Sequence, residues 1–113
     1  MKRPRKPRRV TALPNAPSIA ACEDCPRLSR YVSAFRDDPA YWGRPVPGFG
    51  DPRATLLVLG LAPGAHGANR TGRPFTGDGA GIFLYRALNE VGAADRDVSV
   101  ASDDGLVLSG AFI

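Results

Sequence analysis

Residues that could do chemistry are concentrated in one stretch, Gly60–Asp78, which follows the apolar run Thr55–Leu59 and reads GLAPGAHGANRTGRPFTGD. Between its glycines lie side chains that can carry charge, form hydrogen bonds or stack, namely His66, Asn69, Arg70, Arg73, Phe75 and Asp78. Glycines let the backbone approach a ligand closely, and backbone N–H groups near a helix start favour anions or carbonyl oxygens. The stretch therefore indicates a binding or catalytic loop rather than a connector.

Two phosphate-binding motifs do not fit this loop. A Walker loop needs a lysine after its second glycine, whereas Gly72 is followed by Arg73 and Pro74. The dinucleotide-binding motif G-x-G-x-x-G is matched only partially by the run 77–81, GDGAG, and an isolated match of that kind is weak evidence. The loop is also about twice as long as the usual strand-to-helix connection.

A second candidate group is the pair Cys22 and Cys25, which form a C-x-x-C motif. The residues alone leave three interpretations open: a redox dithiol, half of a zinc site, or half of an iron–sulfur site. Two thiolates complete neither a tetrahedral zinc site nor a [4Fe–4S] cluster. A thioredoxin-like dithiol would follow a strand, whereas a basic, proline-containing segment precedes this pair.

The elements around the loop predict a strand–loop–helix–strand unit. Thr55–Leu59 is a short apolar run typical of a strand covered on both faces. A helix is predicted over 79–91, with Leu84, Leu88 and Val91 on one face and Gly92 as its stop. Leu106–Ile113 is the second predicted strand. This order fits a right-handed βαβ unit, in which ligands bind beyond the carboxyl ends of parallel strands.

The remaining segments are assigned from composition and period. A helical region is predicted over Ile19–Phe35, interrupted near Pro26. Its apolar face comprises Leu28, Tyr31, Val32 and Phe35. Residues 37–52 are rich in proline and glycine and predict an ordered loop that is pinned by aromatic residues, namely Tyr41, Trp42 and Phe49. The segment 93–105 is polar and turn-like.

Bulk composition predicts one folded unit behind a basic arm. The 113 residues carry a net charge of +4, and six positive charges lie in the first nine residues, so the remainder is slightly acidic. We expect a disordered arm over 1–17, which could attract polyanions, and a partial domain over 18–113 that is the N-terminal portion of a longer protein. No apolar run spans a bilayer and no secretory signal is evident, so the expected location is cytoplasmic.

Three features together resemble the N-terminal half of a type 5 iron–sulfur uracil-DNA glycosylase: PVPGFGDP at 45–52, the strand, and the loop Gly60–Asp78. The resemblance runs from about Cys22 to Ile113. Type 4 enzymes share a related loop but usually carry an acidic residue directly after its first glycine, where this chain has Leu61. The resemblance implies an α/β fold, a three-layer arrangement with a central parallel sheet that is incomplete here.

The resemblance also implies roles for the loop residues. Backbone N–H groups around Leu61, Ala62 and Gly64 would face uracil, Phe75 would stack on the flipped base, and Asp78 would orient or activate the attacking water. Each role has a plain alternative: a tight turn at Pro63, a core phenylalanine, and an N-cap of the next helix. Among the remaining candidates, His66 and Asn69 would bind the base, and Arg70 and Arg73 would bind DNA phosphates. The alternative for these residues is that they only brace the loop.

The expected function is a monofunctional DNA glycosylase of base-excision repair, monomeric, acting on uracil-containing DNA and not on a membrane. The resemblance implies tolerance for other deaminated bases such as hypoxanthine. It also makes Cys22 and Cys25 two of the four ligands of a mainly structural [4Fe–4S] cluster. The alternatives are an inactive fragment and a non-catalytic DNA- or nucleotide-binding α/β module. The loop contains no lysine that could form a Schiff base, so lyase activity is not expected.

Overall fold

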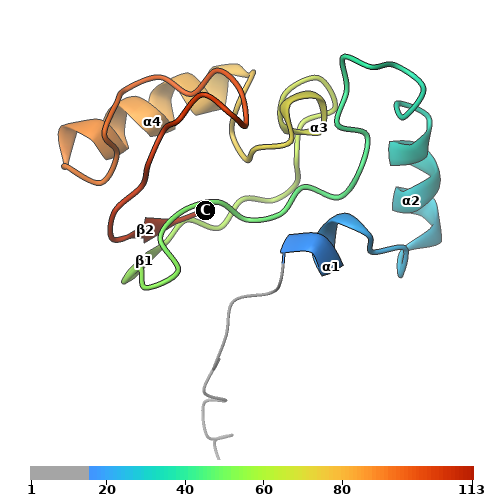
Figure 1. The fold of residues 1–113 in the computed structure, drawn as a ribbon, viewed down its shortest axis with the longest axis horizontal. Coiled ribbons are helices and arrows are strands. Elements are labelled where there is room, and N and C mark those ends of the chain that lie inside the picture. Colours follow the sequence, from blue (N-terminus) through green and yellow to red (C-terminus); the bar gives the residue numbers. More distant parts are fainter. Residues whose placement is uncertain (1–15) are drawn as a thin grey trace, which may run out of the picture.

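The computed structural model describes residues 16–113. Its elements are α1 (Ala16–Ala20), α2 (Pro26–Ser33), β1 (Leu56–Leu57), α3 (Ala68–Thr71), α4 (Gly79–Glu90) and β2 (Ala111–Phe112). The strand pair lies across from α4, and α1 and α2 lie at the other end of the molecule (Figure 1). The basic arm predicted over 1–17 lies outside the described residues, except for its last two, which begin α1.

The two strands pair in parallel, with Leu56 opposite Ala111 and Leu57 opposite Phe112, as the βαβ prediction requires. Both strands are shorter than predicted. The stretch before β2 packs elsewhere, because Leu108 forms an isolated antiparallel bridge with Ala94. Gly110, at φ 73°, then turns the chain into the strand pair. The local run of apolar residues therefore serves two purposes, core packing and sheet pairing.

The prediction that Thr55–Leu59 is covered on both faces is wrong for the described chain. Leu57 is 64% exposed and Leu59 is 87% exposed. Val58 is the member of this run that packs against the core cluster. Within residues 16–113 the sheet has only the two strands. The apolar side chains of the run 55–59 therefore lack the neighbouring layers that would bury them.

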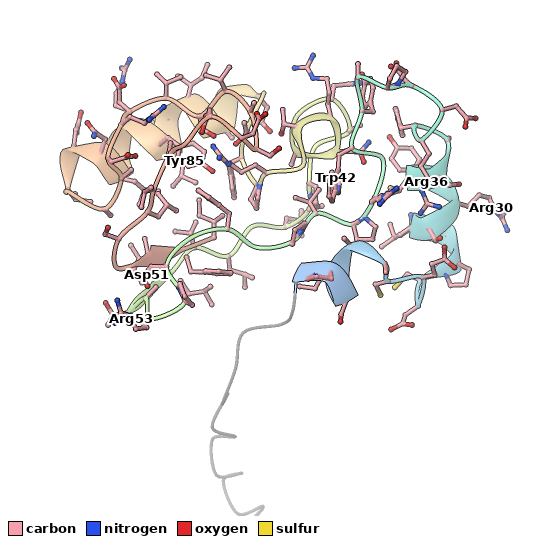
Figure 2. The ribbon with its side chains drawn as sticks, in the orientation of Figure 1. Arg30, Arg36, Trp42, Asp51, Arg53 and Tyr85 are labelled. Atoms are coloured by element: carbon pink, nitrogen blue, oxygen red, sulfur yellow. The ribbon has the colours of Figure 1, made fainter. Side chains whose placement is uncertain are left out.

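Helix α4 follows its sequence signals closely. Gly92, at φ 77°, ends it as predicted, and its N–H donates to the Asn89 carbonyl. On the predicted apolar face Leu88 is buried, but Val91 is 75% exposed because it is already the C-cap residue. Tyr85 supplies the missing core contact and lies on the side of α4 that faces the interior (Figure 2). The core cluster comprises Tyr85, Leu88, Ala94, Leu106, Leu108, Ala111 and Ile113.

The irregular segment 37–52 is held by hydrogen bonds, and Trp42, one of the aromatic residues predicted to pin it, makes two of them. Trp42 N donates to Arg70 O at 2.9 Å, and Trp42 Nε1 donates to Pro45 O at 3.1 Å. Further along, Phe49 and Ile113 exchange two backbone hydrogen bonds. The segment therefore connects the loop after β1 to the end of β2.

The helical region near the cysteines is split into α1 and α2, with Pro26 at the first position of α2. The predicted apolar face is not buried: Leu28 and Tyr31 are both exposed, and α2 has no buried residue. Arg30 points away from the body of the molecule (Figure 2). Among residues 16–113, no helix has the length and hydropathy to cross a membrane.

Candidate functional site

A cavity of about 450 Å³ opens where the loop leaves β1. Its walls come from β1, from the loop, from the start of α4 and from the end of β2. They are mostly apolar side chains and glycines, and the one ionisable side chain among them is that of Asp78. The lining includes Val46, Leu57, Gly60, Leu61, Ala62, Pro63, Gly64, Ala68, Phe75, Asp78, Ala80 and Phe112. The stretch singled out from the sequence therefore does form a cavity.

Asp78 is the N-cap of α4, which was the plain alternative for this residue, and its side chain also lines the cavity. Its backbone is extended, and Oδ1 accepts a hydrogen bond of 2.9 Å from Gly81 N in the first turn of α4. Oδ2 lies over the glycines of the loop: an ideal Cβ at Gly67 would come within 2.7 Å of it, and one at Gly64 within 3.4 Å. One carboxylate oxygen caps the helix while the other faces the loop.

Phe75 lines the same cavity in an unusual backbone conformation. Its φ is 52°, the only positive φ of a non-glycine residue among those described. Such a conformation costs of order 1–3 kcal/mol and persists only where the surroundings impose it. The ring packs at Gly60, where a Cβ would lie 3.0 Å from Phe75 Cζ. The Phe75 carbonyl approaches α4 so closely that a Cβ at Gly81 would overlap it.

Leu61, Ala62 and Gly64 form the exposed rim of the cavity, and Leu61 is fully exposed. Their N–H groups donate no hydrogen bond to any acceptor within residues 16–113. The Gly64 carbonyl, by contrast, accepts from Asn69 N at 3.0 Å and so fixes the turn. The rim therefore offers backbone donors to a ligand.

His66 and Asn69 are not among the residues that line the cavity. His66 is exposed, and its Nδ1 lies 2.7 Å from Tyr41 Oη. Asn69 is 5% exposed; its Nδ2 donates to Ala65 O at 3.1 Å, while Oδ1 has no partner within the described residues. These contacts favour the bracing alternative that the sequence left open for both residues.

The two arginines of the loop are placed differently. Arg70 is exposed and borders the loop near Gly77, as a phosphate contact requires. Arg73 is 3% exposed, and its guanidinium forms an ion pair with Asp104 at 2.8 Å. A buried and paired guanidinium does not reach a DNA backbone, so the phosphate assignment of Arg73 is corrected. Arg73 instead pins the loop, which was the alternative reading.

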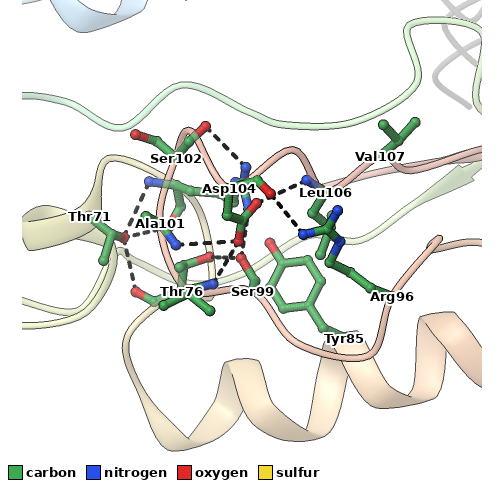
Figure 3. A network of polar contacts seen from close by, with 12 residues as sticks. Thr71, Thr76, Tyr85, Arg96, Ser99, Ala101, Ser102, Asp104, Leu106 and Val107 are labelled. Atoms are coloured by element: carbon green, nitrogen blue, oxygen red, sulfur yellow. Dashed lines mark hydrogen bonds and ion pairs between the residues drawn. The ribbon is translucent and has the colours of Figure 1, made fainter.

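The partners of Arg73 were not found from the sequence. They lie in the segment 93–105, which was predicted only as polar and turn-like, and Figure 3 shows the network that they form. Burial opposes ionisation of Asp104, but backbone hydrogen bonds from Val100 and Leu106 and the Arg73 guanidinium hold its pKa well below the usual range. Burial raises the pKa of Tyr85. The partners lie about thirty residues from Arg73, and no local signal links them to it.

Cys22 and Cys25 are exposed free thiols at the start of α2, and Cys25 is its N-cap residue. Within the described residues no group of three or more His, Cys, Asp or Glu side chains is gathered as a metal site. A [4Fe–4S] cluster takes four thiolates, and this chain has two cysteines. The described residues thus provide half of the required donor set.

The family model of the Uracil DNA glycosylase superfamily matches residues 47–103, which include the whole loop and α4. The chain belongs to the Uracil DNA glycosylase superfamily. This superfamily is α/β, in agreement with the fold class expected from the sequence, and the parallel strand pair is consistent with it.

Curated relatives refine the position within the superfamily. A type-5 uracil-DNA glycosylase of Thermus thermophilus is 52% identical over 103 residues, which are 85% of this chain and 46% of that protein. One of Mycobacterium bovis is 54% identical over 96 residues, 78% of this chain and 35% of that protein. A type-4 enzyme of Pyrobaculum aerophilum is 33% identical over 84 residues, 74% of this chain and 36% of that protein. The expected resemblance to type 5 is confirmed.

The chain spans less than half the length of these relatives. The matched residues, 47–103, contain the loop after β1 and the capped start of α4, and they end one residue before Asp104. Leu61, the position that separates this chain from the type 4 pattern, lies on the exposed rim of the cavity.

Proposed function

We propose that this chain belongs to an enzyme that removes uracil from DNA by hydrolysing the N-glycosidic bond. The observation that carries the proposal is that the Phe75 ring and the Asp78 carboxylate line one apolar cavity at the start of α4. The relatives that match most of this chain are named type-5 uracil-DNA glycosylases. An aromatic face and a carboxylate are the two groups that base stacking and attack at the sugar require.

In this mechanism the target nucleotide leaves the base stack and its base enters the cavity. Phe75 stacks on the base, and the unpaired N–H groups of Leu61, Ala62 and Gly64 donate to its carbonyl oxygens. As the bond between sugar and base breaks, its electron pair leaves with the base. The donors stabilise that negative charge where it develops.

Asp78 serves the other half of the reaction. Oδ1 is held by Gly81 N, so the carboxylate keeps a fixed orientation, and Oδ2 is the oxygen left to act. A carboxylate near the sugar stabilises its oxocarbenium character and orients a water, which adds to the anomeric carbon. The water's proton goes to the departing base, and the products are free uracil and an abasic site. No lysine of the loop is present to form a Schiff base.

The test is excision of uracil from a defined duplex by the full-length protein, with wild type beside Asp78→Asn. We expect wild type to release uracil and leave an alkali-labile site, and Asp78→Asn to be slower by about a hundredfold or more. Asp103→Asn, an exposed aspartate outside the cavity, is the matched control. Full activity of Asp78→Asn would remove Asp78 from the mechanism, and an inactive wild-type protein would favour a non-catalytic DNA-binding module or an inactive fragment.

The substrate range follows from the composition of the cavity. Its walls offer backbone donors and apolar surface, and few side chains that read a particular base edge. We therefore propose that hypoxanthine in DNA is also accepted. Parallel assays on uracil and hypoxanthine duplexes test this, and activity restricted to uracil would contradict it.

We also propose that Cys22 and Cys25 supply two of the four thiolates of a [4Fe–4S] cluster, which would fix the start of α2. Support comes from the exposure of both thiols and from the position of Cys25 as N-cap, where the helix dipole favours a thiolate. Iron content and visible absorbance of the anaerobically purified full-length protein test this. Colourless, iron-free protein, or Cys22→Ser protein with unchanged iron, would refute it.

The complete protein is proposed to be a cytoplasmic monomer with a three-layer α/β fold, of which β1 and β2 are two adjacent parallel strands. The exposed apolar residues of β1 support further layers, since a strand of this composition is normally covered. Sedimentation of the full-length protein tests the monomeric state.

A further inference from the structure

Arg73 lies in a closed polar site inside the molecule rather than on its surface. Nη1 donates to Asp104 Oδ1 at 2.8 Å and to Ser99 Oγ at 2.9 Å, and Nη2 donates to the Ser102 carbonyl at 3.0 Å. The guanidinium also stacks on the ring of Phe49, with Cζ 4.4 Å from the ring centroid. All of these partners come from segments distant in sequence from the loop.

Asp104 organises the other side of this contact. Oδ1 accepts a second hydrogen bond from Leu106 N at 2.9 Å, and Oδ2 accepts from Val100 N at 2.8 Å. The carboxylate thereby closes the turn over 100–106 (Figure 3), and it pairs this turn with the Arg73 guanidinium. The ion pair is therefore a junction between this turn and the loop after β1.

Phe75 is held from both sides by groups of this same site. The residue before it, Pro74, has a carbonyl that accepts from Tyr85 Oη at 2.7 Å. The residue after it, Thr76, is fully buried and its Oγ1 lies 2.7 Å from Ser99 Oγ, which also binds Arg73. The strained φ of 52° at Phe75 is thus imposed by fixed neighbours.

We propose that Arg73 and Asp104 are positioning residues, which hold the ring of Phe75 in the cavity by fixing the backbone on either side of it. Without the ion pair, Ser99 and the turn over 100–106 lose their anchor. The contact to Thr76 is then free to loosen and φ of Phe75 can relax to a negative value. A ring that leaves the cavity cannot stack on a base.

The test compares full-length Asp104→Asn with the neighbouring control Asp103→Asn, whose side chain is exposed. Hydrogen exchange of the peptide over 75–83 reports the position of the segment without any need for activity. We expect exchange in this peptide to rise at least about tenfold in Asp104→Asn, with the second half of α4 little changed. Exchange equal to that of Asp103→Asn, or raised uniformly along α4, would overturn the proposal.

A second test uses enzyme kinetics and rests on the proposed function. For uracil excision, Asp104→Asn should lower kcat by about tenfold to a hundredfold, as misplacement of a contacting group does, with a smaller change in KM. A second pair of variants tests the same ion pair from the other side, and it replaces Asp104→Asn if that variant fails to fold. Arg73→Lys keeps the charge opposite Asp104, so its hydrogen exchange over 75–83 and its kcat should lie closer to wild type than those of Arg73→Gln. An Asp104→Asn variant that changes KM alone, with kcat unchanged, would count against the proposal. So would an Arg73→Lys variant that is no closer to wild type than Arg73→Gln. An inactive wild-type protein would defeat the proposed function, while the exchange result would still decide this inference.

Discussion

Asp78 Oδ1 accepts a 2.9 Å hydrogen bond from Gly81 N, and this contact joins the helix cap to the cavity wall. Gly81 also lies against the carbonyl of Phe75, because a side chain at Gly81 would overlap it. The start of α4 therefore fixes both groups that the proposed chemistry uses. Substitutions at these positions should separate capping, packing and catalysis.

The capping role of Asp78 is separable from its charge. Asn is as good an N-cap as Asp, so Asp78→Asn should lose only the interaction of the charge with the helix dipole, about 0.3–1 kcal/mol. Asp78→Ala should lose about 1 kcal/mol or more of unfolding free energy. Urea denaturation of both variants measures this. Equal stability of wild type and Asp78→Ala would mean that the cap does not stabilise the fold.

Gly79 and Gly81 form a matched pair in the first turn of α4. A Cβ at Gly81 would overlap the Phe75 carbonyl, so Gly81→Ala should cost about 1–3 kcal/mol and reduce uracil excision. A Cβ at Gly79 would meet nothing within 4 Å, so Gly79→Ala should be neutral or stabilising by up to about 1 kcal/mol. Thermal melts and excision assays of both variants check this, and similar effects at the two sites would contradict it.

The ion pair of Asp104 predicts a pH dependence of stability. Its pKa is lowered in the folded state, so its contribution to stability is fully present above the unfolded value of about 3.9 and is lost as pH falls below it. Wild type should therefore exceed Asp104→Asn in Tm at pH 7, and the difference should shrink below about pH 4. If the Tm difference between wild type and Asp104→Asn stayed constant between pH 7 and pH 3, ionisation of Asp104 would not be the source of the extra stability.

Arg70 is the loop arginine that remains placed to contact DNA. If it neutralises one phosphate, Arg70→Gln should weaken binding of every sequence alike and reduce the slope of log K against log salt by about 1. Fluorescence anisotropy with labelled duplexes at several salt concentrations measures the slope. Arg53→Gln, at an exposed arginine before β1, is the control, and the same slope for both variants would exclude the contact.

Much of this molecule was predictable because its signals are local. The boundaries of α4 follow from Asp78 before the helix and Gly92 after it, since caps act on the nearest backbone groups. The parallel pairing of β1 and β2 follows from the order of elements, because a helical crossover returns the chain in the same direction. The loop stood out because glycines and reactive side chains alternate within it.

The predictions that failed depend on contacts that the sequence does not encode locally. The strand Thr55–Leu59 has the composition of a buried strand, yet burial depends on neighbouring layers rather than on the strand itself. Arg73 and Arg70 carry the same side chain three positions apart, and only the fold makes one a buried ion pair and the other an exposed cation.

The sequence by itself therefore determined that the loop after β1 and the start of α4 would form the cavity, because chain order brings the end of β1 and the start of α4 together. The tertiary structure alone decided how those residues are held. Asp104 lies 31 positions from Arg73, and Tyr85 lies 11 from Pro74, so their contacts exist only once the chain has folded. These long-range bonds set the backbone of Phe75, whose positive φ no local preference of phenylalanine would produce.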